Sequence, residues 1–194
     1  MVLKREILLI VVLLISIALL VRAMGFFKTN VEPADATKFV LEDLTIKYPN
    51  ADINVLETKE SRNENGEKYY EVKAKVTEAL YTPCPKRVHI YYNYPVQNFV
   101  PQPAEVITQD CAVCTEGTCI LNYPEEAIIA SHSSPGTSEI GAFVRDYPSA
   151  VPVATDFGTK WLVKWDSISA SYYYEIVMDK NGAMLNVTRS AKVD

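Results

Sequence analysis

The sequence predicts an α+β protein: an N-terminal transmembrane helix, followed by two units that each combine a helix with an antiparallel sheet, with a cysteine-containing insert between the units. Three observations support this fold class. A long apolar run lies near the N-terminus, a helix-and-strand pattern occurs twice, and all four cysteines lie in one segment. The predicted boundaries are 1–28 for the membrane anchor, 29–95 for the first unit, 96–123 for the insert and 124–194 for the second unit.

Residues 7–27 are predominantly apolar, with one charge (Arg22) and no proline, which matches the ~20 residues that cross a bilayer core. A cleaved signal peptide is the main alternative, because Lys4 and Arg5 precede the run. Arg22 is unfavourable for cleavage, however, because it stands where a small residue is needed. The absence of cysteine near residue 20 argues against a lipoprotein anchor, and a buried core helix is the third interpretation.

The predicted localisation follows from this segment. A short basic N-terminus usually stays in the cytoplasm while the following domain is exported. We therefore expect a single-pass membrane protein with a cytoplasmic N-terminus and an extracytoplasmic domain, in contact with the lipid bilayer through residues 7–27. Acidic side chains outnumber basic ones beyond residue 28, so the domain should stand away from anionic headgroups.

The first unit begins with an amphipathic helix, in which Val40, Leu44 and Tyr48 recur every four positions. Pro49 ends this helix. The turn signal Asn65-Gly66 predicts a hairpin among the strands that follow. Alternating apolar and polar residues place these strands at 52–59, 67–79 and 87–93.

The second unit repeats this plan. Tyr147-Pro148-Ser149-Ala150 ends a short helical stretch, as Tyr48-Pro49-Asn50-Ala51 does in the first unit. The expected strands lie at 151–156, 159–167, 171–179 and 183–189. We interpret the repeated order of elements as an internal duplication.

The final hairpin carries the segment Tyr174-Glu-Ile-Val-Met-Asp179-Lys-Asn-Gly182-Ala-Met-Leu. Together with the helix that ends at Tyr-Pro, this meander resembles PepSY-like and cystatin-like α+β modules over residues 35–93 and 136–190. The resemblance implies exported, membrane-anchored modules that bind or inhibit a partner and do not catalyse a reaction.

The clustered cysteines are Cys84, Cys111, Cys114 and Cys119. Two structural disulfides would fix the proline-rich insert to the sheet, and closing the loop of about 27 residues between Cys84 and Cys111 would stabilise the fold by about 3–4 kcal/mol. Four reduced thiolates could instead bind zinc, since Cys111 and Cys114 have C-x2-C spacing, although the spacing to Cys119 is not standard. A redox-active Cys111–Cys114 pair is the third interpretation, although no strand–CxxC–helix context supports it.

No catalytic residue and no cofactor-binding residue can be nominated, so we expect a protein that is not an enzyme. His89 falls on a predicted strand and His132 near a helix end, where structural roles are more common than catalysis. The serines beside His132 lack a Gly-x-Ser-x-Gly elbow. Glu125-Glu126 reads as the first turn of a helix, and Asn186-Val-Thr188 is a candidate N-glycosylation site.

Two functional hypotheses follow. The first is a single-pass membrane-anchored extracytoplasmic binding module without catalytic activity, whose partner is a protein or envelope component. The second is a zinc-binding or thiol-redox protein centred on the four cysteines. Nucleic acid is not expected among the partners, because 24 acidic side chains outnumber 19 basic ones and the net charge is −5.

Overall fold

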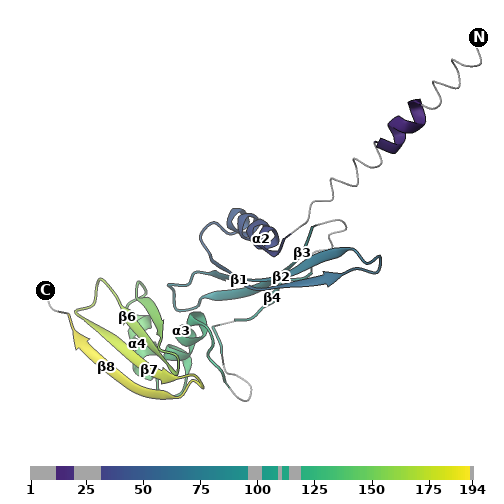
Figure 1. The fold of residues 1–194 in the computed structure, drawn as a ribbon. Helices are drawn as coiled ribbons and strands as arrows, with labels where there is room; N and C mark the ends of the chain where they lie inside the picture. The colour runs from purple at the N-terminus through teal and green to yellow at the C-terminus, as the bar shows by residue number, and fades with distance from the viewer. Residues whose placement is uncertain (1–11, 20–31, 96–101, 109–110, 114–118, 193–194) are drawn as a thin grey trace, which may run out of the picture. The chain divides into compact units, whose positions relative to one another are not determined.

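Two four-stranded antiparallel sheets, each accompanied by helices, make up residues 33–194 in a computed structural model (Figure 1). The strand orders are β1-β2-β3-β4 and β5-β6-β7-β8, so each strand pairs with its neighbour in sequence. Residues 1–32 form a separate unit. The structure describes residues 12–19, 32–95, 102–108, 111–113 and 119–192.

The elements of the unit 33–194 follow one another along the chain without crossovers. The helices are α2 (Pro33–Lys47), α3 (Pro124–Ser133) and α4 (Ser138–Asp146). The first sheet contains β1 (Asp52–Arg62), β2 (Lys68–Glu78), β3 (Lys86–Tyr94) and β4 (Glu105–Val106). The second contains β5 (Val151–Asp156), β6 (Lys160–Asp166), β7 (Tyr172–Asp179) and β8 (Met184–Ala191).

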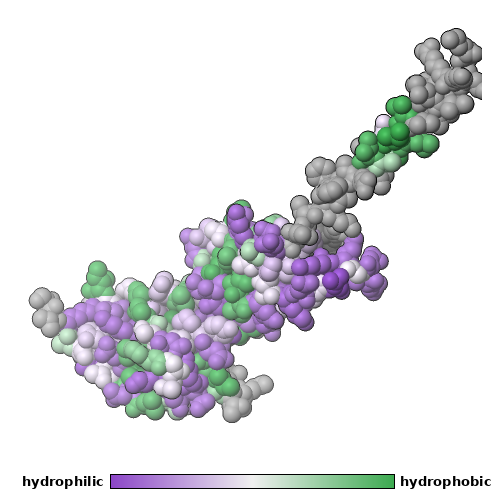
Figure 2. All heavy atoms as spheres, viewed as in Figure 1, coloured by the Kyte–Doolittle hydropathy of each residue, from purple (hydrophilic) through white to green (hydrophobic). Residues whose placement is uncertain are grey.

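The fold class predicted for the N-terminus is wrong. Within the described residues, no helix is long and apolar enough to cross a membrane. Of the predicted span 7–27, the structure describes residues 12–19, which form an exposed apolar helical stretch (Figure 2), and the remainder lies outside the described residues. The predicted localisation, a single-pass membrane protein with a cytoplasmic N-terminus and an extracytoplasmic domain, is wrong for the same reason, since it depended on a spanning helix.

The sheets also differ from the predicted units in two details. The first sheet gains β4 from the segment predicted to be an insert, and a strand of two residues is too short to show any periodicity. Two helices precede the second sheet, whereas the repeated plan predicted one and only Glu125-Glu126 indicated the start of another. The first of them, α3, is buried along Ala127–Ser131, so its sequence lacks the polar face that marks an amphipathic helix.

The helix α2 covers one face of the first sheet. It buries Ala36, Val40 and Leu44 and packs mainly on β1 and β2. The Tyr92 hydroxyl on β3 donates a hydrogen bond of 2.5 Å to Asp43 on α2, which ties the helix to the sheet. The buried sheet residues beneath the helix are Tyr70, Val72, Ala74, Val76, Val88 and Tyr92.

A second core lies between the helices α3 and α4 and the inner face of the second sheet. Both tryptophans are buried there, and each indole N–H has a hydrogen-bond acceptor. Trp165 donates to the Ser131 hydroxyl at 2.8 Å, and Trp161 donates to the Leu121 carbonyl at 2.8 Å. The two bonds connect β6 to α3 and to the segment before it.

The two Tyr-Pro-x-Ala segments form the same turn. The amide of Tyr48 donates to the carbonyl four residues earlier at 2.8 Å, and that of Ala51 donates to the Tyr48 carbonyl at 3.1 Å. In the second segment, Tyr147 and Ala150 make the equivalent bonds, both at 2.9 Å. Each turn leads from a helix into the first strand of a sheet.

A buried charge cluster connects the first sheet to α3. Lys75 on β2, Arg87 on β3 and Glu125 on α3 are 4%, 4% and 0% exposed. The Glu125 carboxylate lies 3.4 Å from Arg87 Nη1 and 3.7 Å from Lys75 Nζ. Arg87 also pairs with Glu126 at 2.8 Å, and Lys75 pairs with Asp52 at 3.2 Å. The second core is thus joined to the first sheet through charged groups.

We predict that Glu125→Ala destabilises the protein by about 1–3 kcal/mol, because Arg87 and Lys75 lose their shared buried anion and keep only Glu126 and Asp52 as partners. Urea denaturation followed by circular dichroism measures the change. Glu139→Ala is the matched control: Glu139 also lies in the first turn of a helix but is exposed, so a change within about 0.5 kcal/mol is expected. Equal stabilities of the two variants would contradict the prediction.

Candidate functional site

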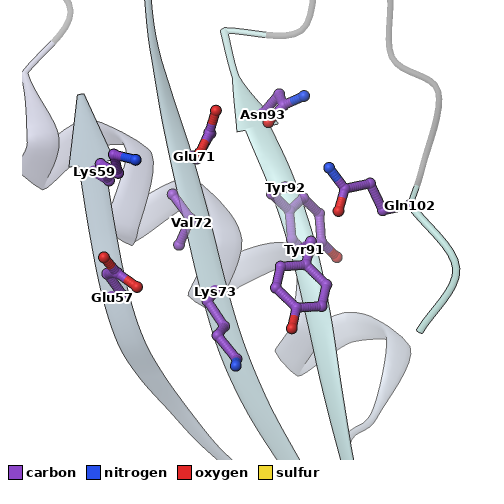
Figure 3. Close-up of a pocket in the computed structure, with 9 residues that line it drawn as sticks. All are labelled: Glu57, Lys59, Glu71, Val72, Lys73, Tyr91, Tyr92, Asn93 and Gln102. Carbon is purple, nitrogen blue, oxygen red and sulfur yellow. The ribbon is translucent and has the colours of Figure 1, made fainter. Parts of the chain in front are cut away.

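The face of the first sheet opposite α2 is polar and contains a pocket of about 280 Å³ (Figure 3). Strands β1, β2 and β3 form its floor, and the segment before β4 contributes Gln102 from the side. The residues that line it are Glu57, Lys59, Glu71, Val72, Lys73, Tyr91, Tyr92, Asn93 and Gln102.

Charges of both signs alternate across the pocket floor. The strand register places Glu57 opposite Lys73 and Lys59 opposite Glu71. Among the described residues, no opposite charge lies within 4.0 Å of any of these four groups. The Lys73 ammonium instead lies 5.4 Å from the centre of the Tyr91 ring. Glu71 accepts a hydrogen bond of 2.8 Å from the Tyr69 hydroxyl through one carboxylate oxygen, and the charged ends of Glu57, Lys59 and Lys73 are available to a bound molecule.

A hydrogen-bonded group of three side chains lies beside the pocket, where β3 meets β4. The Tyr91 hydroxyl donates to Glu105 Oε2 at 2.8 Å, and His89 Nδ1 lies 3.4 Å from the same oxygen. The hydrogen bond from Tyr91 lowers the pKa of Glu105. Burial, together with the nearby charges of Lys73 and Arg87, lowers the pKa of His89.

This group does not fit a catalytic base. His89 is 6% exposed, and its Nε2 atom is buried without a hydrogen-bond partner among the described residues. A general base must come within hydrogen-bond reach of the substrate proton that it removes. The buried Nε2 offers no such approach, so we interpret His89 as a structural residue, as its position on a strand predicted.

The cysteine cluster contains a disulfide between Cys84 and Cys111, whose Cα atoms are 5.0 Å apart. Cys119 is disulfide-bonded as well, no described cysteine is free, and Cys114 lies outside the described residues. Cys84 and Cys111 therefore have no thiolate to offer to the predicted four-cysteine zinc site. Nor do the described residues contain any group of three histidine, cysteine or acidic side chains that could hold a metal ion.

His132 lies next to this disulfide. Its Nε2 atom is 2.8 Å from the Pro83 carbonyl oxygen and 3.8 Å from Cys111 Sγ. Because a carbonyl oxygen only accepts, Nε2 carries a proton and donates it to Pro83. The Trp165 ring packs edge-on against the imidazole with 5.4 Å between the ring centres, and burial lowers the pKa of His132.

The other candidates from the sequence lie apart from the pocket. Asn186 lies on the exposed strand β8, where its side-chain amide donates to Thr188 Oγ1 at 3.1 Å. Ser131 and Ser133, beside His132, each donate their hydroxyl to a carbonyl of their own helix at 2.7 Å, so neither is poised as a nucleophile. Glu125 and Glu126 do lie in the first turn of α3, as predicted.

The pocket was not found from the sequence. The alternation of Glu71, Lys73 and Lys75 on β2 did signal a polar sheet face. The pairing with β1 decides which charges lie across from one another, and an internal shift in the register between Val55 and Glu57 is not encoded in the alternation. Gln102 could not be placed at all, because its segment shows no period.

No known family model matches this chain, and no curated protein matches it. Among solved structures, it is similar to a crystal structure described as a "putative lipoprotein" from Clostridium difficile 630, with 12% sequence identity and a TM-score of 0.24. The match covers 82% of this chain and 93% of that chain. A likeness at this level carries no inference about fold or function. The resemblance to PepSY-like and cystatin-like modules is untested by it and stays a prediction.

We predict that the folded state loses stability as the pH falls from about 7 to about 5, because burial holds the pKa of both histidines below the value near 6.5 of an unfolded chain. The unfolded chain then takes up protons first, and each histidine contributes a slope of at most about 1.4 kcal/mol per pH unit. Urea denaturation at a series of pH values measures the slope.

The control for this experiment is the double variant His89→Gln/His132→Gln, which removes both histidines of the chain. Its stability should be nearly independent of pH in this range. The carboxylates whose pKa is lowered, such as Asp43 and Asp166, lose their contribution to stability as the pH falls through the unfolded value of 3.8, which lies below this range. A wild-type profile as flat as that of the double variant would refute the assignment.

Proposed function

We propose that this protein is a non-catalytic binding module that holds a segment of a polypeptide partner in the pocket on the polar face of the first sheet. The observation that carries the proposal is the set of four charged side chains of alternating sign, none within 4.0 Å of an opposite charge among the described residues. Side chains that already paired with one another would have little to offer a ligand.

The chemistry of the pocket suits a peptide. Asn93 and Gln102 each supply an amide that both donates and accepts, as a peptide backbone requires. Lysine and glutamate side chains on the floor would pair with charged residues of either sign, and Tyr91 offers an aromatic surface. A volume of about 280 Å³ is at the lower limit for small-molecule pockets, but it accommodates side chains of a segment that rests on the sheet.

The absence of catalysis is part of the proposal. It is supported by the burial of His89 Nε2 and by the hydroxyl groups of Ser131 and Ser133, which are bonded to helix carbonyls. The identical Tyr-Pro-x-Ala turns support the related proposal that the chain is a duplicated PepSY-like or cystatin-like module. The Cys84–Cys111 disulfide favours folding in an oxidising compartment.

We predict that peptides selected from a phage-displayed random library on the full chain bind through this pocket. Lys73→Glu should weaken their binding at least about tenfold, because it replaces a cation on the pocket floor with a third carboxylate. Fluorescence anisotropy with a labelled selected peptide measures the dissociation constant.

Lys160→Glu is the matched control, since it makes the same charge reversal at an exposed position of the second sheet. A change of less than about twofold is expected for it. Failure to enrich any peptide, or equal binding to both variants, would overturn the proposal.

A further inference from the structure

The Cys84–Cys111 disulfide differs from a buried structural staple in its accessibility. Cys84 is exposed, between two prolines, and Cys111 is half-buried. Exchange of a disulfide begins when a thiolate attacks one sulfur in line with the S–S bond, so that the other sulfur leaves. The greater exposure of the Cys84 residue favours attack at Cys84 Sγ, with Cys111 Sγ as the leaving group.

The leaving sulfur has a proton donor at its side. His132 Nε2 lies 3.8 Å from Cys111 Sγ, and its N–H is directed at the nearby Pro83 carbonyl. The Pro83 carbonyl oxygen lies 3.5 Å from Cys111 Sγ, so a thiolate formed at Cys111 would compete with this carbonyl for the N–H and would accept a charge-assisted hydrogen bond from it. The imidazole is held by the Trp165 ring, so it is in place before the reaction begins.

The backbone conformation at Cys111 also favours opening of the disulfide with Cys111 as the leaving group. Its φ angle is 57°, in the left-handed region that residues other than glycine rarely adopt. A residue keeps such a conformation only while its surroundings hold it there, and such residues cluster at functional sites. Opening of the disulfide removes one of the constraints that hold Cys111 in this conformation.

From these observations we infer that Cys84–Cys111 is an exchangeable disulfide, which an external dithiol reduces by attack at Cys84 while Cys111 leaves as a thiolate beside His132. The inference does not depend on peptide binding in the pocket. Its substrate class is a dithiol, either a small molecule or a protein with two neighbouring cysteines.

The reaction balances in two exchanges. In the first, a thiolate of the dithiol forms a bond to Cys84 Sγ, the Cys84–Cys111 bond breaks, and its electron pair stays on Cys111. In the second, the remaining thiolate of the dithiol attacks the other sulfur of the dithiol, which is bonded to Cys84 in the mixed disulfide. Cys84 is then released as a thiolate. The dithiol is oxidised to its cyclic disulfide, the protein gains two electrons, and the two new thiolates take up the protons that the dithiol released.

The first test is reduction of the full chain by dithiothreitol without denaturant, with quenching by N-ethylmaleimide and peptide mapping by mass spectrometry. We expect Cys84 and Cys111 to be modified at a rate proportional to the dithiothreitol concentration. Glutathione, a monothiol, lacks a second thiol for an intramolecular second exchange, so we also expect N-ethylmaleimide, by capturing the Cys111 thiolate after a short reaction, to leave glutathione on Cys84. A rate that saturates at the rate of global unfolding, or glutathione found on Cys111, would overturn the inference.

The second test concerns the role of His132 as a positioning residue. His132→Phe keeps a ring against Trp165 but removes the N–H, and it should slow reduction about tenfold. His132→Gln restores a donor and should recover most of the rate, which a loss of packing alone would not explain. His89→Gln is the matched control and should react as the wild type does.

Each variant is compared at equal stability, set by urea titration, so that a change in unfolding is not mistaken for a change in exchange. If His132→Phe does not fold, His132→Leu replaces it as the variant without an N–H, and the glutathione experiment on the wild type still decides which sulfur is attacked. Folded His132→Phe protein that is reduced as fast as the wild type would remove His132 from the mechanism.

Discussion

The burial of the Glu125 carboxylate between Lys75 and Arg87 is the constraint on which the unit 33–194 depends. A charge out of contact with water costs several kcal/mol unless it is paired, and Glu125 is 0% exposed. Its partners belong to β2 and β3, while Glu125 itself opens α3, the helix that covers the second core. Neither the first sheet nor α3 can move away without leaving a buried charge unpaired.

This constraint divides the polar face of the first sheet into two regions with different tasks. At one end, Lys75 and Arg87 form ion pairs with Glu125 of α3 and are buried. Along the same strands, Lys73 and Tyr91 lie in the pocket, where the charged groups are unpaired among the described residues. Alternate residues of β2 and β3 thus serve structure at one end and binding at the other.

The disulfide fixes a segment that has little secondary structure of its own. The strand β4 pairs with β3 at only two positions, and the Thr108 hydroxyl adds a bond from the Arg87 amide at 2.7 Å. Cys111 follows shortly afterwards and connects this segment to the chain before β3. Gln102 and Glu105 both lie within the loop that the disulfide closes, so the wall of the pocket depends on weak local structure with one covalent restraint.

Sequence patterns over a few residues predicted those helices, turns and strands that depend on side chains close together in the sequence. The amphipathic period of α2, the Tyr-Pro-x-Ala turns and the alternation along β1–β3 and β5–β8 predicted those elements to within about three residues of the observed ends, because each depends on side chains a few positions apart. The apolar run at 7–27 satisfied a length and composition rule, yet no described helix meets the requirement for a membrane span.

Only the tertiary structure decided which distant groups meet. Glu125 and Arg87 are 38 residues apart in sequence, and Cys111 and His132 are 21 apart. The sequence identified the first turn of α3 and the histidine near its end, but it could not show that the turn buries a carboxylate or that the histidine lies beside a disulfide. Burial and pairing are set by the whole packed unit, and no pattern confined to a few neighbouring residues contains that information.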